Sequence, residues 1–285
     1  MTGSTALPED ATEHGNVLRK NAPRLSEEGG RESKQRPLPV NLPILNCFMT
    51  HDTSSIHAIT LLSGGLDSCV ETAEAVATHG RSVGALHVSY GQRTANRELA
   101  AFAAIADHYG LTTRLHADAG YLGRMGGSSL VDDHLTIPTS HATSTSADDG
   151  SQLPNTYVPF RNTHLLSIAV AWAEVLGAVE IFCGAHAADS AYPDTQPEFF
   201  DAFQHLLHSA LPAPTEIIVR TPLMSLDKKA IVQRGAELSA PLQLTWSCYA
   251  EESTPCGRCH SCHLRQTGFE EAGLRDPLSS TSDLQ

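Results

Sequence analysis

The stretch at residues 58–68, AITLLSGGLDS, decides the fold. Its apolar half predicts a short buried strand, its two glycines predict a turn, and a helix is expected to begin at Leu66. Consecutive glycines reach backbone angles that other residues avoid, so their N–H groups and those of the first helical turn can surround one anion. Ser63 and Ser68 add hydroxyl donors. Asp67 repels phosphate and therefore indicates a magnesium ion or an ammonium-like group nearby. The element is predicted to hold a phosphate, with a plain strand-to-helix turn as the alternative.

A second constellation lies near the C-terminus, where four of the seven cysteines occur close together: Cys248, Cys256, Cys259 and Cys262. The last three have the spacing Cys-x2-Cys-x2-Cys, and four thiolates complete the tetrahedron of a structural zinc site. An odd cysteine count and no recognisable signal peptide argue against disulfides. An iron–sulfur cluster is the competing assignment, because the same spacing occurs in ferredoxins. His260 and His263 are expected to be bystanders, since four sulfurs already fill a zinc site.

Between these two motifs, apolar runs alternate with stretches of helical periodicity. Strands are predicted at residues 58–62, 83–88, 112–117, 179–183 and 216–221. Helices are predicted from residue 66 and at residues 95–109, 161–176, 198–209 and 226–238. This alternation predicts an α/β fold, a doubly wound parallel sheet with helices on both faces. Ligands of such sheets bind beyond the carboxyl ends of the strands, which is where the glycine turn lies.

The same patterns predict how the chain is divided. Residues 1–56 have the composition of a disordered extension, and residues 57–245 are expected to form the nucleotide-binding α/β domain. Residues 246–277 are expected to form the zinc-binding segment, and residues 278–285 a disordered tail. A long acidic, Ser/Thr-rich stretch at residues 126–155 is either a lid over the site or a solvated loop.

Composition restricts the class of protein. The chain has 285 residues, a net charge of −13 and 41% hydrophobic residues, without an apolar run of membrane-spanning length. No stripe of arginine or lysine is present, which disfavours a nucleic acid as a direct partner. These features predict a soluble, cytoplasmic enzyme that acts on a small molecule or a protein.

The motifs together resemble a known family. A Ser-Gly-Gly-x-Asp-Ser turn after a strand is similar to the loop of the N-type ATP pyrophosphatases, and the chain has no ordinary P-loop signature. From residue 57 to residue 277 the chain resembles QueC, the 7-cyano-7-deazaguanine (preQ0) synthase family. Besides the glycine turn and the cysteines, the matching stretches are VSYGQR at 88–93, LPNTYVP at 153–159 with RN at 161–162, YPD at 192–194, PEF at 197–199, TPLM at 221–224 and GFEEAG at 268–273.

The resemblance implies a HUP-type fold and an ATP-dependent C–N ligase. Such an enzyme adenylates 7-carboxy-7-deazaguanine, converts the adenylate with ammonia to the amide, and uses a second ATP to form the nitrile preQ0. A carboxylate needs this activation because its own leaving group would be an oxide. The implied cofactors are ATP, Mg²⁺, which neutralises the charge on the departing pyrophosphate, and the Zn²⁺ of the cysteine cluster.

The resemblance also implies roles for individual residues. The catalytic group would comprise Ser63, Asp67 and Ser68. The nucleotide would contact a larger set: Leu62, Ser63, Gly64, Gly65, Leu66, Asp67, Ser68, Arg93, Arg161 and Asn162. The substrate acid would contact Tyr157, Phe160, Tyr192, Asp194 and Gln196. Both arginines are expected to face the nucleotide or the substrate, since a guanidinium suits phosphate recognition.

Two positions depart from the family pattern. Phe160 stands where the family usually has glycine, and its ring could form the wall of a pocket; Gln196 stands where the family has arginine. The alternative function is therefore a QueC-like variant that stops at the amide or joins the deazaguanine acid to another amine, such as a protein amino group. A tRNA-modifying relative and a non-catalytic nucleotide-binding protein are further alternatives. The oligomeric state is left open, with a homodimer among the options.

Overall fold

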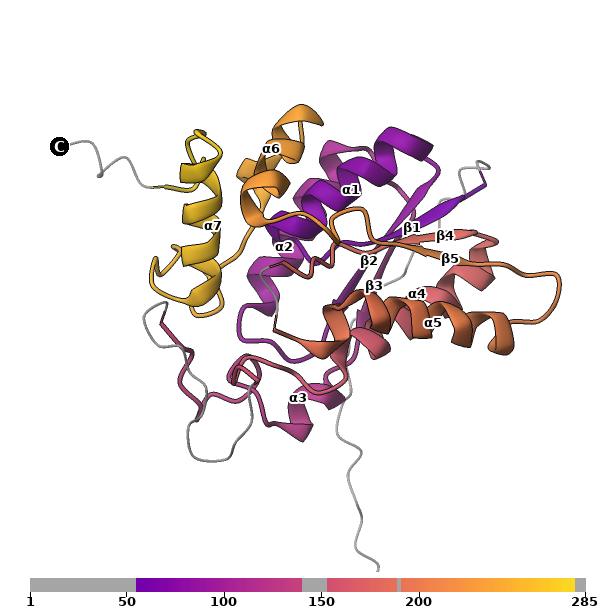
Figure 1. Cartoon of the computed structure of the whole chain (residues 1–285), viewed down its shortest axis with the longest axis horizontal. Coiled ribbons are helices and arrows are strands. Elements are labelled where there is room, and N and C mark those ends of the chain that lie inside the picture. Colours follow the sequence, from indigo (N-terminus) through magenta and orange to yellow (C-terminus); the bar gives the residue numbers. More distant parts are fainter. Residues whose placement is uncertain (1–54, 140–152, 189–190, 280–285) are drawn as a thin grey trace, which may run out of the picture. The chain divides into compact units, whose positions relative to one another are not determined.

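A five-stranded parallel sheet forms the centre of the molecule. The structure is a computed structural model that describes residues 55–139, 153–188 and 191–279, all within one compact unit of the chain, Phe48–Gln285. The strand order is β3-β2-β1-β4-β5 (Figure 1). The strands are β1 (Ala58–Leu61), β2 (Val83–Ser89), β3 (Arg114–Asp118), β4 (Glu180–Phe182) and β5 (Ile218–Arg220). The strand order reverses between β1 and β4, which is the topological switch point of the sheet. The ligand crevice of this topology therefore lies at the carboxyl ends of these two strands.

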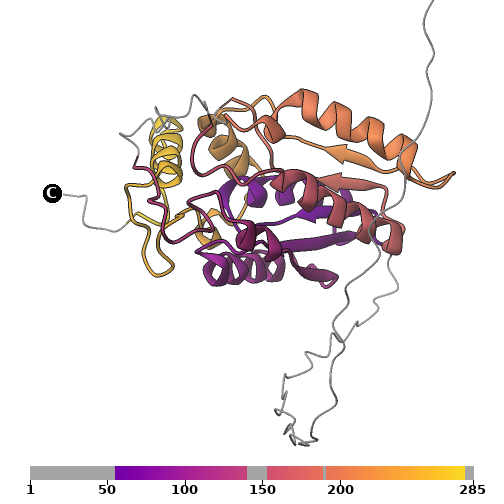
Figure 2. The same cartoon turned by 90° about the horizontal axis from the view of Figure 1, so that it is seen from below.

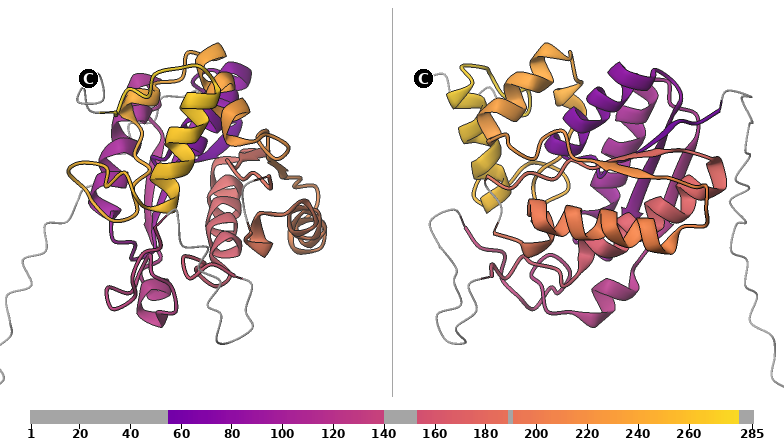
Figure 3. Two further views of the ribbon diagram at one scale, coloured as in Figure 1. Left: turned by 60° about the vertical axis from the view of Figure 1, so that its left-hand side comes forward. Right: turned by 45° about the vertical axis from the view of Figure 1, so that its right-hand side comes forward.

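Helices cover both faces of the sheet (Figures 2 and 3). One side carries α1 (Leu66–His79), α2 (Ala95–His108) and α6 (Lys228–Glu237), with α7 (His260–Glu271) packed against α6. The other side carries α4 (Arg161–Leu176) and α5 (Pro197–Ala210). Short pieces complete the described chain: α3 (Tyr121–Met125) and the 3₁₀ turns η1 (Pro193–Thr195) and η2 (Leu242–Leu244).

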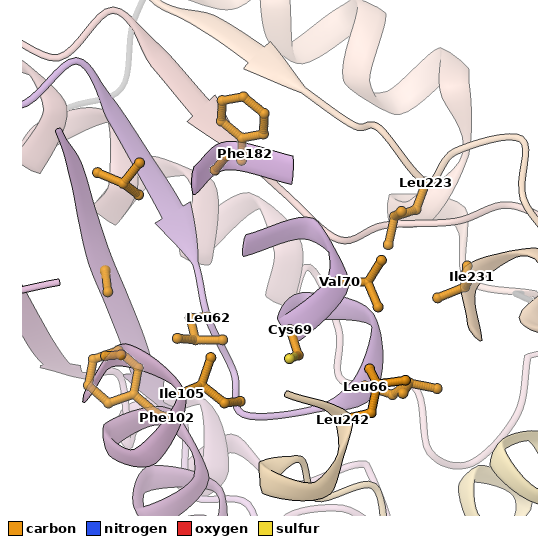
Figure 4. Packing of buried hydrophobic residues seen from close by; sticks show 14 of the residues in the cluster. Leu62, Leu66, Cys69, Val70, Phe102, Ile105, Phe182, Leu223, Ile231 and Leu242 are labelled. Atoms are coloured by element: carbon orange, nitrogen blue, oxygen red, sulfur yellow. The ribbon is translucent and has the colours of Figure 1, made fainter. Parts of the chain in front are cut away.

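The alternation of side chains along the strands explains the two cores. In β1, Ala58 joins the cluster beneath α1 and α2, whereas its neighbour Ile59 joins the cluster beneath α4 and α5. Successive side chains of a strand point to opposite faces, and both faces are buried, so the central strands are mostly apolar, with buried Thr60 in β1 and His87 in β2 as polar exceptions. Figure 4 shows the first cluster, in which Leu62, before the glycine turn, lies near Ile105 and Phe102 of α2, and Leu66, after the turn, lies beside Leu242.

The predicted α/β class and doubly wound parallel sheet are confirmed. All five predicted strands occur within two residues of their expected starts, and the helix predicted at 161–176 has those same bounds. The sequence prediction did not include α3 or α7. The expected tail up to residue 54, the centre of the acidic stretch (140–152), which was expected to be a lid or a solvated loop, and the end of the chain from residue 280 lie outside the described residues. None of the helices in the described part of the chain has the length and apolarity that a membrane crossing needs.

One carboxyl group is fully enclosed between β1 and α1. Glu71 is fully buried, and the Thr60 hydroxyl lies 2.9 Å from each of its two carboxyl oxygens. Burial raises the pKa of Glu71 well above its ordinary value, against the lowering effect of hydrogen bonds from Thr60 and Thr72. A neutral acid suits this geometry, because one of its oxygens accepts a hydrogen bond while the other donates one. Glu71 is therefore part of the polar core rather than of a catalytic site.

We expect Glu71→Gln to stabilise the protein, relative to wild type, increasingly as the pH rises above the ordinary glutamate pKa of 4.5. The stabilising contribution of a group whose pKa is raised by folding is complete below the unfolded pKa and is lost as the pH rises through the folded pKa. Gln presents the same donor and acceptor as the neutral acid but does not titrate. Urea unfolding at several pH values should show that the free energy of unfolding of Glu71→Gln exceeds that of wild type by an amount that grows by up to about 1.4 kcal/mol per pH unit. A difference that is independent of pH would contradict the assignment.

Candidate functional site

The glycine turn connects β1 to α1 at the switch point of the sheet. Gly64 has a φ of +92°, and a Cβ there would lie 2.5 Å from the carbonyl oxygen of Glu98 in α2, so glycine is required for both conformation and space. The Ser63 and Ser68 hydroxyls lie 3.0 Å apart, and the Gly65 N–H donates to Ser63 Oγ at 3.2 Å. The first N–H groups of α1 have no intrahelical acceptor and carry the positive end of the helix dipole. The predicted phosphate cradle is thus present as a geometry.

Asp67 is paired with an ammonium group that the sequence prediction left open. Its Oδ1 accepts a hydrogen bond from Lys228 Nζ at 2.6 Å, and its Oδ2 lies 3.5 Å from Nε2 of His186. Burial alone would raise the pKa of Asp67, but the charge of Lys228 and the contact with His186 lower it well below its ordinary value. Of the two expected partners of Asp67, a magnesium ion and an ammonium-like group, the structure therefore places the ammonium beside it.

A cavity of about 300 Å³ opens at the carboxyl ends of β1 and β4, beside the glycine turn. Eight of the predicted site residues line it: Ser63, Gly65, Leu66, Asp67, Ser68, Arg161, Asn162 and Tyr192. The remaining predicted contacts do not: Leu62, Gly64, Arg93, Tyr157, Phe160, Asp194 and Gln196. Leu62 and Gly64 still shape the turn, since Leu62 packs in the core and Gly64 O accepts the Trp246 N–H at 2.8 Å.

Aromatic rings and one arginine form the part of the cavity away from the turn. The guanidinium of Arg161 lies 5.5 Å from the ring centre of Tyr90 and 6.0 Å from that of Tyr192, within cation–π distance of both. Burial raises the pKa of Tyr90 to about 12 and also raises the pKa of Glu98 at the cavity wall, which favours their neutral forms. Arg161 is therefore a positive charge in a largely neutral aromatic setting, which suits a planar ring that carries an anionic group.

Asn162 and Asp194 link the cavity wall to the turn before α5. The Asn162 backbone N–H donates to Asp194 Oδ2 at 3.0 Å, and the Asn162 side-chain amide donates to the Asp194 carbonyl at 2.8 Å. Asp194 is thus held behind Asn162, with only the latter at the cavity surface. The predicted role of Asp194 in substrate contact stays a prediction, and its position in this structure is that of a residue that orients α4.

Arg93 lies away from the cavity, unlike the nucleotide-facing position expected from the sequence. Its guanidinium donates to the carbonyls of Asp132 and Leu135, the latter at 2.6 Å, and lies 3.2 Å from an oxygen of Asp133. These residues belong to the described part of the acidic stretch at 126–155. Local sequence cannot distinguish an arginine that binds phosphate from one that holds a loop, because an arginine directly after a strand can do either.

The substrate-side residues do not line the cavity: Tyr157 and Phe160 directly precede α4, and Gln196 is the N-cap residue of α5. Tyr157 Oη accepts the Phe160 N–H at 3.2 Å, and the Gln196 amide donates to the Tyr192 carbonyl at 3.3 Å. Phe160 has a φ of +60°, so a phenylalanine occupies the left-handed conformation that glycine usually provides. Phe160 is 60% exposed and is not among the residues that line the cavity, so its substrate role stays a prediction.

We expect Phe160→Gly to raise the free energy of unfolding by about 0.5–1 kcal/mol, because a side chain in the left-handed region strains the backbone. The ring is mostly exposed, so little packing is lost. Phe160→Ala, which keeps a Cβ at the same φ, should bring no such gain and is the matched control. Thermal or urea unfolding of the three proteins measures the effect. Equal stability of the glycine and alanine variants would show that φ at residue 160 does not limit stability.

The four predicted cysteines meet in space. Sγ atoms of Cys248, Cys256, Cys259 and Cys262 all lie within 4.8 Å of one another, and this is the one group of potential metal ligands found in the described part of the chain. Backbone N–H groups of Ala250, Glu251 and Cys256 point at the sulfur of Cys248 at 3.3–3.4 Å, the environment of a thiolate. A tetrahedral site with metal–sulfur bonds of about 2.3 Å needs sulfurs about 3.8 Å apart, and Cys256 and Cys262 are 4.0 Å apart. The cluster can therefore hold a metal ion.

Two polar residues of the site, His186 and Lys228, were missed by sequence reasoning. His186 lines the cavity, and Lys228 contacts Asp67, which lines it. Lys228 is the first residue of α6 and follows shortly after the TPLM motif at 221–224, which was the available signal. His186 follows β4, and position at the carboxyl end of a central strand could have singled it out from the other histidines. Cys183, the residue directly after the same strand, also lines the cavity; burial raises the pKa of its thiol to about 12.

Comparison with known proteins gives consistent matches. Residues 57–273 match the protein family described as "Queuosine biosynthesis protein QueC". A 7-cyano-7-deazaguanine synthase from Chlorobium phaeobacteroides is 49% identical over 222 residues, which cover 78% of this chain and 95% of the relative. Another from Koribacter versatilis is 49% identical over 223 residues, covering 78% and 92%. The structure of NMN synthetase from Francisella tularensis aligns over 80% of this chain and 81% of its own at 12% identity, with a TM-score of 0.39.

Proposed function

The chain belongs to the family of queuosine biosynthesis protein QueC, and we propose that it is a 7-cyano-7-deazaguanine synthase. It adenylates 7-carboxy-7-deazaguanine with ATP and converts the product with ammonia, through the amide, to the nitrile. The observation that carries the proposal is one cavity with two unlike ends. The helix N-terminus at Ser63 to Ser68 suits phosphate, and the aromatic end around Arg161 suits a planar acid.

The reaction follows from the leaving groups. A carboxylate oxygen of the acid attacks the α-phosphorus of ATP, the bond to the bridging oxygen breaks, and pyrophosphate departs. Ammonia then attacks the acyl carbon, AMP leaves with the bonding electrons, and a proton is released. The amide oxygen attacks a second ATP in the same way, and loss of AMP and two protons leaves the carbon–nitrogen triple bond. Each step needs phosphate charge to be neutralised.

The chain's own residues can supply much of that neutralisation. The N–H groups at the start of α1 and the hydroxyls of Ser63 and Ser68 would contact the phosphates, and Lys228, held on Asp67, would add a positive charge. Arg161 would hold the carboxylate of the acid between Tyr90 and Tyr192. A Mg²⁺ ion that enters with ATP would neutralise the remaining charge. Arg93 is left out of this set because of its position.

The metal of the four-cysteine cluster is proposed to be zinc in a structural role. Four sulfurs close the coordination sphere and leave no open position for chemistry, which is typical of structural rather than catalytic zinc. His260 and His263 are exposed and are not part of the four-cysteine group, so no ligand role is proposed for them.

The alternative of a protein or other amine as acceptor depended on Phe160 and Gln196. Neither side chain lines the cavity, so no observation on the described residues favours an altered acceptor site. Incubation of the protein with ATP, Mg²⁺, 7-carboxy-7-deazaguanine and ammonium, followed by mass spectrometry, tests the proposal. A mass corresponding to the nitrile, with about two AMP per product, is expected from the two adenylation steps. Product that stops at the amide, or no AMP at all, would overturn the proposal.

A further inference from the structure

Lys228 is fixed by the element that it begins. Asp227 caps α6, because its Oδ1 accepts the Ala230 N–H at 2.8 Å, and this cap sets the direction in which the first side chain of the helix leaves. The Lys228 side chain is only 11% exposed. Its Nζ lies 2.6 Å from Asp67 and 3.3 Å from Nε2 of His186. The aliphatic part of the Lys228 side chain is therefore confined between α6 and the element that packs against α6.

The residue that the Lys228 side chain passes is Gly268, in the interior of α7. A Cβ at this position would lie 2.5 Å from Lys228 Cγ and 3.1 Å from the Lys228 carbonyl oxygen. The Cγ atom is near the backbone, so it cannot swing away as the end of a flexible side chain does. A glycine inside a helix is about 1 kcal/mol less favourable than alanine, and here the close passage of Lys228 accounts for it. Figure 1 shows α6 and α7 side by side.

Helix α7 is itself held in register with the glycine turn. Its N-terminal end carries Cys259 and Cys262 of the metal cluster. Further along, buried Arg265 donates to Thr245 Oγ1 at 2.7 Å and to the Leu242 carbonyl at 3.3 Å. The segment that follows these residues donates the Trp246 N–H to Gly64 O of the turn. The position of Gly268 relative to the glycine turn is therefore fixed by two sets of contacts: the cysteine cluster at the start of α7, and the hydrogen bonds that link Arg265 to the segment bound to the turn.

We propose that Gly268 is a positioning residue for the nucleotide site: its missing side chain lets the stem of Lys228 lie against α7 and brings Nζ onto Asp67. The four-cysteine segment thereby sets the place of the lysine that pairs with Asp67 at the phosphate end of the cavity. The inference rests on the proposed function for the identity of the ligand, ATP. It adds that the C-terminal segment acts on the phosphate end through Gly268 and Lys228.

The test compares Gly268→Ala with a matched control, Gly235→Ala. Gly235 is in α6, and a Cβ there would meet Val70 at 2.9 Å and Leu242 at 3.1 Å but not Lys228, so the control crowds the same region without touching the lysine. Gly268→Ala should raise the Kd for a non-hydrolysable ATP analogue and lower the rate of AMP formation by about tenfold to a hundredfold, the effect of a misplaced group. The KM for the deazaguanine acid should stay unchanged, and Gly235→Ala should alter neither nucleotide quantity.

A double-mutant cycle with Lys228→Met separates positioning from general crowding. If Gly268 acts through the lysine, adding Gly268→Ala to Lys228→Met brings no further loss of nucleotide affinity. An equal loss in both backgrounds, or an unchanged affinity in Gly268→Ala, would overturn the inference, and melting temperatures of all variants reveal any that fail to fold. Absence of AMP formation by the wild type would instead refute the proposed function. The inference on Gly268 would still be tested in that case, because the double-mutant cycle measures binding of the ATP analogue and needs no turnover.

Discussion

Asp67→Asn is expected to reduce the rate of AMP formation from ATP and the deazaguanine acid by about a hundredfold, the effect of displacing a catalytic charge by about 1 Å. The carboxylate holds Lys228 Nζ at 2.6 Å, and Asp67 itself lines the cavity at the N-terminus of α1. An asparagine has nearly the same size but no charge, so it holds an ammonium far less firmly. Steady-state release of AMP and pyrophosphate measures the effect, and Asp201→Asn on the exposed face of α5 is the matched control.

The same substitution should destabilise the fold, although it removes no core atoms. It leaves the largely buried ammonium of Lys228 without its counter-charge, which we expect to lower the free energy of unfolding by about 1–3 kcal/mol. The double variant Asp67→Asn with Lys228→Met removes both charges and should regain much of that stability while staying inactive. Recovery of activity together with stability would show that the pair is structural. Wild-type turnover in Asp67→Asn alone would refute its place in the mechanism.

The framework of the site could be predicted because its signals are local. The apolar run before Ser63 is enclosed on both faces of the sheet, and such enclosure produces a continuous apolar stretch that the sequence displays directly. The need for glycine at position 64 also has a local component, its positive φ. The cysteine cluster was equally legible, since three of its four members are close in sequence and the ligand chemistry is restrictive.

Contacts between distant parts of the chain could not be predicted in this way. The pair of Asp67 and Lys228 joins residues 161 positions apart, and no property of either local sequence names the other. Arg93 shows another limit: its motif position indicated a phosphate contact, whereas in the structure its guanidinium donates to the carbonyls of a loop. Phe160 shows a third limit, because a backbone conformation that favours glycine can be imposed on another residue when the helix that follows is well packed.

The arrangement of α7 gives the cysteine cluster a wider effect than its own segment. Cys259 is the N-cap residue of α7, and Arg265 and Gly268 of the same helix contact the elements that hold the glycine turn and Lys228. Metal binding to such a site contributes directly to the free energy of folding. Loss of the metal is therefore expected to disturb the phosphate end of the cavity as well as the C-terminal segment.

Cys259→Ser should accordingly release the metal and lower the melting temperature by about 10 °C, which for a domain of this size corresponds to roughly 3–4 kcal/mol. Elemental analysis of freshly purified wild type is expected to find about one zinc per chain, and the variant close to none. Cys69→Ser is the matched control, because Cys69 is a fully buried thiol outside the cluster; it should lose some stability and keep its metal. AMP formation should fall in Cys259→Ser more than in Cys69→Ser at a temperature where both are folded. Iron together with inorganic sulfide in the wild type would show that the site holds an iron–sulfur cluster rather than zinc. Full retention of zinc in Cys259→Ser would show that Cys259 is not a ligand.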